Sequence, residues 1–283
     1  MISLPITEGK LKVPDFSLGE FKPSFSIAIP AFNEETRIEE TLQKWIGFLD
    51  RFYPGEYEIL VIMDGCTDNT VDVVSKFANE RVVPLVYSER LGKGGALIEA
   101  FKRSRGDVIF FTDADGSLNV DEFASFMNAI EFGDLVIGCR YFRGSDFVVS
   151  LPFCRLVFSR VFNGLVQLLF PKLRGVYDTQ CGAKAVRRGV ISKVGDDLFI
   201  TDFTFDINLI YSVLRFGFVV KEIPVEYAHV ESDSKVSRSL FKIGFGMFLS
   251  LVRLRLYYSK LRRLVFGDGV LRRLVGFLVK VVS

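Results

Sequence analysis

The sequence is poor in two residue patterns that often reveal an enzyme class: histidines and closely spaced cysteines. A single histidine, His229, occurs in 283 residues, so a Ser-His-Asp triad or a histidine-rich metal site would have to be built around that one residue. The four cysteines have no CxxC spacing and are expected to be buried thiols of a reducing compartment. Both absences argue against a serine hydrolase and against a cysteine- or histidine-based metal centre.

Long hydrophobic runs are also missing. No stretch reaches the roughly 18 uncharged apolar residues that a membrane-spanning helix needs, and the richest one, 243–252, is bounded by Lys242 and Arg253. Yet 49% of the residues are apolar and 29 are phenylalanine. The sequence therefore predicts no span, and its apolar side chains are expected to fill a core or to lie on a surface.

Acidic residues are almost absent from the C-terminal part of the chain. Residues 235–283 contain eleven Lys or Arg and a single acid, Asp268, although the net charge of the whole chain is only +2. A basic, apolar tail suits an anionic surface, either lipid headgroups or nucleic acid. Helices expected at about 240–261 and 271–281 suit a membrane interface; the alternative is that they pack on the body of the protein.

Strands and helices alternate through the first 140 residues. Apolar runs predict buried strands, and 3.6-residue periodicity predicts helices between them. The strands are expected at 24–30, 57–63, 82–88, 107–113 and 134–140, and the helices at 34–50, after DGCTDNT, 96–105 and 120–132. This alternation predicts an α/β fold with a doubly wound, mostly parallel sheet, whose site lies at the carboxyl ends of the strands.

The pattern changes after Arg140. An amphipathic helix is expected at 151–170, a second helix at 203–216 and a strand at 218–227. The intervening segment DTQCGAKAV receives no assignment to a helix or strand.

The strongest chemical signal is Asp113-Ala114-Asp115 at the end of an apolar strand. Two carboxylates one residue apart on a bend can both face Mg²⁺ or Mn²⁺, which would also bind diphosphate oxygens. The alternative is an ordinary acidic turn.

Two further motifs suit a nucleotide: one follows the first predicted strand, and the other precedes a predicted helix. Pro30-Ala31-Phe32-Asn33-Glu34 ends the first strand, where an aromatic ring and a carboxylate can hold a nucleobase; alternatively, Asn33 begins a helix. Lys93 lies among glycines before a helix, a position that suits an anion, although the spacing of a Walker A loop is absent.

In order, PAFNEE, DGCTDNT, LGKGGA, TDADGS and GCRY resemble the motifs of family 2 glycosyltransferases with the GT-A fold, from about Ser24 to Tyr227. YDTQCGAKAV and FDINLIY are similar to segments of the dolichyl-phosphate glucose synthases; the dolichyl-phosphate mannose synthases share the first half. The resemblance implies inverting transfer of a hexose to dolichyl or polyprenyl phosphate. UDP-glucose is the first choice of donor, GDP-mannose the second, and Mg²⁺ or Mn²⁺ the cofactor.

The resemblance also implies roles for single residues. Contacts to the nucleotide sugar are expected from Pro30, Ala31, Phe32, Glu34, Asp64, Lys93, Asp113, Ala114 and Ser117, and metal contacts from Asp113 and Asp115. Catalytic roles fall to Arg140, Asp178 and Lys235, and phosphate or acceptor contacts to Arg155, Arg160 and Gln180. Two departures from the family bear on the choice of nucleotide: Met63 precedes Asp64 where many relatives have a second aspartate, and Phe32 replaces a tyrosine.

A phosphate acceptor changes the requirement for catalysis, because its second pKa is about 6 and it is ionised at neutral pH. Direct displacement by the lipid phosphate then needs no general base. A hydroxyl acceptor would need one, and Asp202 or Asp206 could serve, unless they are solvated carboxylates at a helix start.

Three alternatives to this function are weighed. A processive polysaccharide synthase is disfavoured, because it normally carries QxxRW and several spans, whereas the only tryptophan is Trp45. A transferase with a lipid-linked or soluble glycan acceptor remains open. A non-catalytic lipid-binding scaffold is less favoured, because the Asp113–Asp115 motif, the pair Arg155 and Arg160, and Lys235 are all intact.

The expected layout has three parts. They are an N-terminal lead at 1–22, a GT-A catalytic domain at 23–232 with a nucleotide-binding half (23–140) and an acceptor half (141–232), and basic membrane-attachment helices at 233–283. We expect a peripheral or monotopic protein on the cytoplasmic side of a membrane, serving protein or lipid glycosylation, with no nucleic-acid partner.

Overall fold

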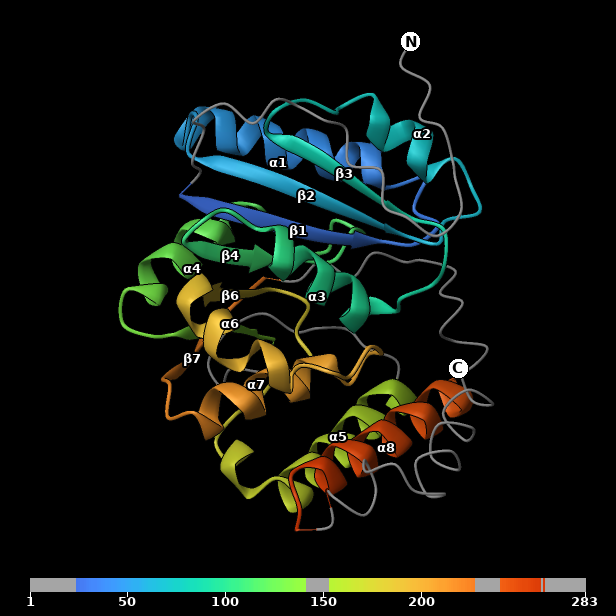
Figure 1. Ribbon diagram of the computed structural model, residues 1–283, viewed down its shortest axis with the longest axis vertical. Helices are drawn as coiled ribbons and strands as arrows, with labels where there is room; N and C mark the ends of the chain where they lie inside the picture. Colours follow the sequence, from blue (N-terminus) through green and yellow to red (C-terminus); the bar gives the residue numbers. More distant parts are fainter. Residues whose placement is uncertain (1–23, 141–152, 227–239, 261, 263–283) are drawn as a thin grey trace.

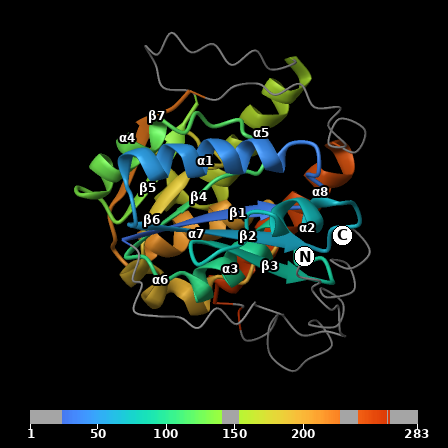
Figure 2. The same cartoon turned by 90° about the horizontal axis from the view of Figure 1, so that it is seen from above.

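The computed structural model describes residues 24–140, 153–226, 240–260 and 262, with the backbone alone at 153–160 and 240–243. Seven strands form one sheet in the order β3-β2-β1-β4-β6-β5-β7, with helices on both faces (Figures 1 and 2). The strands are β1 (Phe25–Ala31), β2 (Tyr57–Asp64), β3 (Val82–Tyr87), β4 (Val108–Phe111), β5 (Leu135–Cys139), β6 (Lys184–Arg187) and β7 (Val220–Pro224). The expected α/β fold with a mostly parallel sheet is confirmed.

Successive side chains of a strand point to opposite faces, and β4 shows how this organises the core. Phe110 packs against Trp45 and Phe123, at ring-centroid distances of 5.5 and 5.3 Å. Its neighbour Phe111 lies 5.8 Å from Phe101. Helices α1 (Ile38–Phe52) and α4 (Glu122–Ile130) therefore cover one face, and α3 (Lys93–Arg103) covers the other.

Strand β6 is the main feature that the sequence did not predict. It lies between β4 and β5 and runs antiparallel to both, whereas the other strand pairs are parallel. It has only four residues, and the fully buried Lys184 at its start interrupts the apolar pattern that identifies a buried strand. The proposed acceptor half thus contributes β6 and β7 to the same sheet as the nucleotide-binding half.

The remaining helices include α2 (Thr70–Ser75), α5 (Phe153–Leu169), α6 (Arg188–Val194), α7 (Phe205–Arg215) and α8 (Leu240–Tyr257). Helices α5 and α8 both lie below the sheet in Figure 1. One face of α8 packs on the body: Leu251 and Leu254 are fully buried, and the Tyr258 hydroxyl lies 2.8 Å from that of Ser212 on α7. Packing on the body, the alternative weighed for this helix, is therefore observed; the second basic helix, 271–281, lies outside the described residues.

In the part of the chain that the structure describes, no helix combines the length and hydrophobicity needed to cross a bilayer.

Candidate active site

The carboxyl ends of β1, β2 and β4 meet at one edge of the sheet, because β1 pairs in parallel with both neighbours. Such edges hold the ligand sites of parallel α/β sheets. The motif beginning at Pro30 follows β1, Asp64 ends β2, and the Asp113–Asp115 turn follows β4. The structure thus brings three sequence-predicted groups to one place.

Hydrogen bonds hold the Asp113–Asp115 turn in place. The carbonyl of Ala114, which is buried, accepts a hydrogen bond of 3.0 Å from the hydroxyl of Thr41 on α1. Asp115 Oδ1 accepts the Ser117 N–H at 3.0 Å, and Asp113 Oδ1 lies 2.6 Å from Lys93 Nζ. The turn is therefore a supported structure and not a loose acidic loop.

Glu34 lies near these carboxylates. Burial raises the pKa of Glu34, the ion pair with Arg37 partly offsets this effect, and the charges of Asp115 and Asp113 raise the pKa further. Its carboxylate lies 2.5 Å from the Arg37 guanidinium. Three acidic side chains thus face a common region at this edge.

The donor set fits a hard divalent cation that completes its coordination with diphosphate oxygens. Mg²⁺ in particular is usually bound through one or two carboxylates and substrate phosphates. Asp113, which is paired with Lys93, and Asp115 supply two carboxylates at this turn. Among the described residues, no group of three or more His, Cys, Asp or Glu side chains is arranged to hold a metal.

The loops after β1 and β2 are joined to each other. Asn33 has a positive φ of 54°, which asparagine tolerates better than most residues; its side-chain oxygen accepts the Thr67 N–H at 2.8 Å. The Glu34 N–H donates to the Thr70 hydroxyl at 2.8 Å. Helix α1 begins only at Ile38, so the alternative interpretation of Asn33 as a helix start is wrong.

Arg90 is a member of this site that the sequence did not reveal. Its guanidinium stacks over the Phe32 ring at 3.4 Å from the centroid and lies 3.6 Å from Asp64 Oδ2. Asp64 is buried and also accepts the backbone N–H groups of Leu91 (2.5 Å) and Gly92 (3.1 Å). The predicted nucleotide contact Asp64 therefore anchors the loop before α3, and only this folding brings Arg90 to Phe32.

The glycine-rich start of α3 does not present free amides to an anion. The N–H groups of Gly94 and Gly95 donate to the Thr201 carbonyl at 2.9 and 3.2 Å. A Cβ on Gly94 would lie 2.5 Å from both the Ile200 carbonyl oxygen and Phe205 Cβ, so glycine is needed for close packing. The anion interpretation of these amides is therefore not supported, whereas Lys93 remains directed at Asp113.

Asp178 and Arg140 form a bidentate ion pair. Arg140 Nε donates to Asp178 Oδ2 at 2.8 Å, and its Nη2 donates to Oδ1 at 3.0 Å. Asp178 is fully buried and also accepts the Arg140 N–H at 3.1 Å. A catalytic role was predicted for both residues and stays a prediction; the structure shows that both carboxylate oxygens of Asp178 hold the guanidinium.

Glu222 on β7 supports this pair and was not predicted. Its carboxylate accepts the N–H groups of Tyr177 (3.0 Å) and Asp178 (2.9 Å). Burial raises the pKa of Glu222, and these two N–H groups partly offset the effect.

Asp202 and Asp206 are not solvated carboxylates at a helix start, as one interpretation had it. Asp202 accepts the Thr204 N–H at 2.7 Å and the hydroxyl of Ser250 on α8. Asp206 is only 3% exposed and pairs with Lys184 Nζ at 2.6 Å. Both are engaged within the fold.

The structure describes the remaining predicted residues to different extents. Gln180 Nε2 is buried and makes no hydrogen bond to the described residues. Arg155 and Arg160 belong to α5 where the backbone alone is described, and Lys235 lies outside the described residues. Their roles stay predictions.

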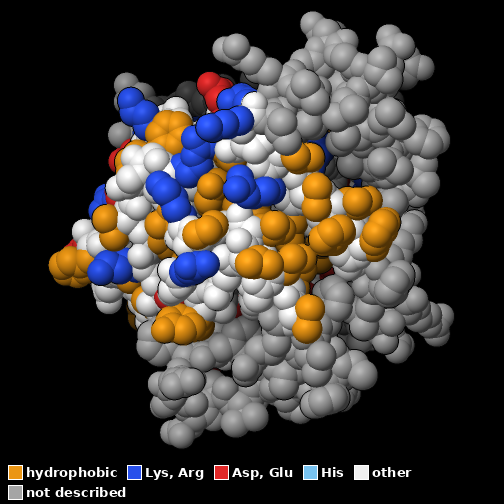
Figure 3. All heavy atoms as spheres, turned by 90° about the horizontal axis from the view of Figure 1, so that it is seen from below, with side chains coloured by type: hydrophobic (Ala, Val, Ile, Leu, Met, Phe, Trp, Pro, Cys, Tyr) orange, Lys and Arg blue, Asp and Glu red, His pale blue; other side chains and the backbone are white. Residues whose placement is uncertain are grey.

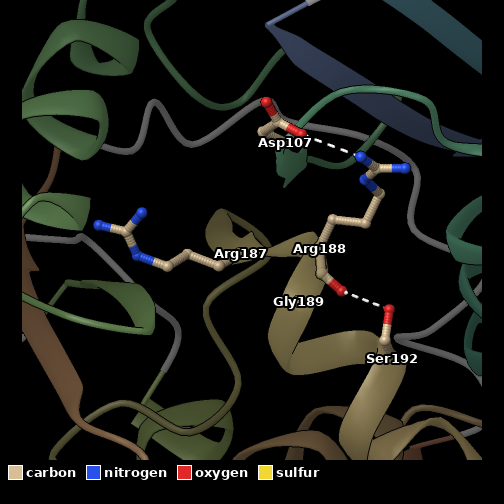
Figure 4. A pocket seen from close by; sticks show the side chains of 5 residues that line it. All are labelled: Asp107, Arg187, Arg188, Gly189 and Ser192. Atoms are coloured by element: carbon tan, nitrogen blue, oxygen red, sulfur yellow. Dashed lines mark hydrogen bonds and ion pairs between the residues drawn. The ribbon is translucent and has the colours of Figure 1, made fainter.

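A cavity of about 530 Å³ lies at the opposite end of the sheet, lined by Asp107, Arg187, Arg188, Gly189 and Ser192 (Figure 4). Asp107 directly precedes β4, whereas Asp113 follows it. The two arginines point apart: Arg187 donates to the carbonyls of Gly133 and Ile130, and Arg188 pairs with Asp107 at 2.9 Å. No predicted site residue lines this cavity.

Solved structures support the fold. The glucosyl-3-phosphoglycerate synthase of Mycobacterium tuberculosis, solved with Mn²⁺, UDP and glucosyl-3-phosphoglycerate, matches with a TM-score of 0.60 and 22% identity over 85% of each chain. The same enzyme has been solved with Mg²⁺ and UDP, at a TM-score of 0.58. At this identity the likeness establishes a shared architecture and nothing further about ligands.

Curated relatives are closer in sequence. The chain is 30% identical to a dolichyl-phosphate beta-glucosyltransferase of Drosophila melanogaster, over 86% of this chain and 79% of that protein. For the enzyme of the same name in Saccharomyces cerevisiae, the identity is 28%, over 81% and 74%. Glycosyltransferase AglD of Haloferax volcanii is 32% identical over 78% of this chain, which spans only 35% of the length of AglD.

A family model agrees with the motifs, the sheet and the relatives. The model described as glycosyl transferase family 2 matches residues 26–195, a range that contains the Asp113–Asp115 turn, Arg140 and Asp178. The protein belongs to glycosyltransferase family 2.

Proposed function

We propose that this glycosyltransferase moves glucose from UDP-glucose to the phosphate of dolichyl or another polyprenyl phosphate, with inversion at the anomeric carbon. The observation that carries the proposal is that carboxylates in the acceptor half, which could serve as a general base, already make contacts within the protein. Asp178 and Asp206 are paired with cations, and Asp202 and Glu222 accept backbone N–H groups. The names of the curated relatives support the same acceptor and sugar.

A hydroxyl acceptor needs a carboxylate that can take its proton. Asp178 is bound by Arg140, Asp206 by Lys184, and Asp202 by Thr204 and Ser250. Taking a proton would break these contacts, so none of the three suits a general base. A lipid phosphate is already ionised at neutral pH and needs no base, since its second pKa is about 6.

The proposed step is a direct displacement. A phosphate oxygen of the acceptor forms a bond to the anomeric carbon while the bond from that carbon to UDP breaks, and UDP leaves with the electron pair. Arg140 and Lys93 reduce the repulsion between the two anionic reactants, and the buried amide of Gln180 offers a hydrogen-bond donor. A divalent ion at Asp113 and Asp115 would neutralise charge on the leaving diphosphate.

An acceptor assay tests this proposal. Purified protein with Mn²⁺ and dolichyl phosphate is expected to consume UDP-glucose faster than GDP-mannose and to release a glucosylated lipid. The rate should rise as the pH increases through about 6, where the acceptor phosphate loses its second proton, and then level off. Faster transfer to a glycan hydroxyl than to dolichyl phosphate would contradict the phosphate acceptor, and preference for GDP-mannose would contradict the donor.

An exposed apolar and basic surface supports a lipid acceptor. Hydrophobic side chains gather on the underside of the molecule next to Lys and Arg (Figure 3), on the side where α5 and α8 lie. Large apolar residues on these helices are exposed: Val161, Leu168, Phe245 and Phe248. We propose that this surface lies on the cytoplasmic leaflet, where apolar burial and basic residues act together.

Replacing Phe245 and Phe248 with serine tests the surface. Fully burying an exposed phenylalanine contributes about 1.5–3 kcal/mol. Phe245 and Phe248 are 48% and 39% exposed, so each would contribute part of this free energy, and the double variant should sediment less with anionic liposomes. Phe132→Ser is the matched control, because Phe132 is 75% exposed but lies at the end of α4. Equal sedimentation of wild type and the double variant would show that α8 does not contact lipid.

A further inference from the structure

Three arginines around the C-terminal end of α8 stack on aromatic rings. The pairs are Arg253 over Phe199, Arg262 over Tyr257 and Arg215 over Tyr258, at 5.3, 4.0 and 4.2 Å from the guanidinium carbon to the ring centroid. The three rings form a row, because the Tyr257 centroid lies 4.2 Å from that of Phe199 and 5.0 Å from that of Tyr258. These six residues, which we call the arginine cluster, join α8 to the end of α7 and to the loop before α7.

The arginine cluster has an excess of positive charge. Within the part of the chain that the structure describes, its three guanidiniums form no ion pair, whereas six other arginines are paired with carboxylates. Arg262 Nη2 donates to the Tyr257 hydroxyl at 2.7 Å, and this hydroxyl donates to Asp197 at 3.1 Å. Burial lowers the pKa of Arg253, and the charge of Asp202 partly offsets this effect. Two carboxylates thus face three guanidiniums.

The stacked guanidiniums keep hydrogen-bond donors for a ligand. Stacking occupies a face of the planar group, whereas its N–H donors point outward in the plane. The side chains of Arg215 and Arg253 make no hydrogen bond to any described residue, and Arg215 and Arg262 are exposed. Two parallel N–H groups of an arginine match two oxygens of a phosphate. The cluster therefore suits phosphate groups at the surface of the protein.

A lipid headgroup fits this surface better than a nucleic acid does. A base of a single strand needs a free ring face on which to stack, and a guanidinium already covers a face of each ring in the cluster. Phe245 and Phe248 are exposed on the same helix, about two turns before Arg253, and apolar side chains lie next to Lys and Arg on this side (Figure 3). Tyrosine is also enriched at the headgroup level of membranes.

We infer that the arginine cluster is a binding site for the headgroup phosphates of anionic phospholipids, which adds lipid selectivity to the apolar contact of α8. The inference rests on the membrane surface proposed above but not on the transfer reaction. No predicted site residue belongs to the cluster, so headgroup binding is a function separate from donor binding.

Vesicle binding tests the cluster. Wild type should bind vesicles of phosphatidylcholine with phosphatidylserine more tightly than vesicles of phosphatidylcholine alone. Replacing all three arginines with glutamine should weaken binding to the phosphatidylserine vesicles by about 10²-fold, because each basic residue near an anionic surface contributes about fivefold in affinity. Replacing all three with lysine keeps the charge but removes the paired N–H groups. This affinity should then fall by about tenfold, which is about two- to threefold for each hydrogen bond lost.

Arg81→Lys is the matched control. The Arg81 guanidinium also lies over a tyrosine ring, that of Tyr57 at 5.3 Å, but it is paired with Asp50 at 2.8 Å. This variant should bind both kinds of vesicle as wild type does. If the triple lysine variant does not fold, as judged by thermal unfolding, Arg215→Lys with Arg262→Lys takes its place, because both arginines are exposed; about a fivefold loss is then expected.

The outcomes separate the inference from the proposals above. Equal binding of wild type to vesicles with and without phosphatidylserine would overturn the inference and leave the apolar surface in place. Wild-type affinity in the folded lysine variant would also overturn it, since charge alone would then explain binding. Tighter binding of single-stranded RNA than of vesicles, lost in the glutamine variant, would overturn the lipid assignment in favour of a nucleic acid. A wild type that binds vesicles but transfers no glucose to dolichyl phosphate would contradict the proposed reaction alone.

Discussion

Replacing Asp115 with asparagine is expected to abolish most of the transferase activity while leaving the fold intact. The change removes a negative charge from the turn after β4 but keeps the shape of the side chain and an oxygen for the Ser117 N–H. Loss of one preorganised electrostatic contact typically costs about 10²–10³-fold in rate, and the weakened metal site should cost at least that much. Initial rates across a Mn²⁺ titration measure the effect, and excess Mn²⁺ should restore the rate only in part.

Asp121→Asn is the matched control, because Asp121 is an exposed aspartate at the start of α4. It should retain wild-type turnover and wild-type dependence on Mn²⁺. A chelator should reproduce the Asp115→Asn loss in the wild-type protein. If the Asp115 variant turned over normally, or if chelation had no effect on wild type, the turn would have no role in metal binding.

Asp178→Asn is expected to reduce both stability and activity. The substitution leaves the Arg140 guanidinium beside a fully buried, neutral side chain, and breaking a buried ion pair typically costs about 3–5 kcal/mol of unfolding free energy. Arg140 should then lose its orientation toward the reactants, with a fall in kcat of about 10²-fold or more. Denaturant unfolding and kinetics on the folded fraction measure the two effects separately.

Asp107→Asn is the matched control for Asp178→Asn, because Asp107 forms an ion pair of the same chemistry at the surface. Asp107 and Arg188 are 2.9 Å apart and well exposed, and exposed pairs contribute only about 0–1 kcal/mol.

A different result for Asp178→Asn would identify Asp178 as a general base. The variant would then be as stable as wild type, and the pH dependence of kcat would lose its acidic limb.

Much of the scaffold follows from local sequence patterns. The apolar runs that became β1, β2 and β4 predicted strands to within a few residues, because burial on both faces of a parallel sheet requires a nearly continuous apolar segment. The predicted position of the Asp113–Asp115 turn at a strand end also held, since parallel strands bring their carboxyl ends to one edge. The resemblance to family 2 glycosyltransferases assigned Phe32 and Asp64 to the same site, and the strands that lead to them, β1 and β2, do lie beside each other.

Strand β6 and the ion pairs depended on tertiary structure. Lys184 and Asp206 are 22 residues apart, and Arg140 and Asp178 are 38 apart, so no local periodicity links either pair. A charged residue in a sequence is expected to be solvated, and only its partner in space explains its burial. The pairing of these two residues was therefore not predicted. Asp206 was considered as a general base or as a solvated carboxylate, and Lys184 was not singled out.

The sequence alone predicts the α/β fold, the edge of the sheet that carries the candidate site and the membership in glycosyltransferase family 2. These properties depend on apolar periodicity and on short motifs, whose chemistry acts within a few residues. The tertiary structure decided which carboxylates are committed to partners, and that Arg90 lies on Phe32. It also showed that α8 buries one face in the body while leaving Phe245 and Phe248 exposed. Such features depend on the distances between side chains of different elements, which are defined only when the sheet and its helices pack together.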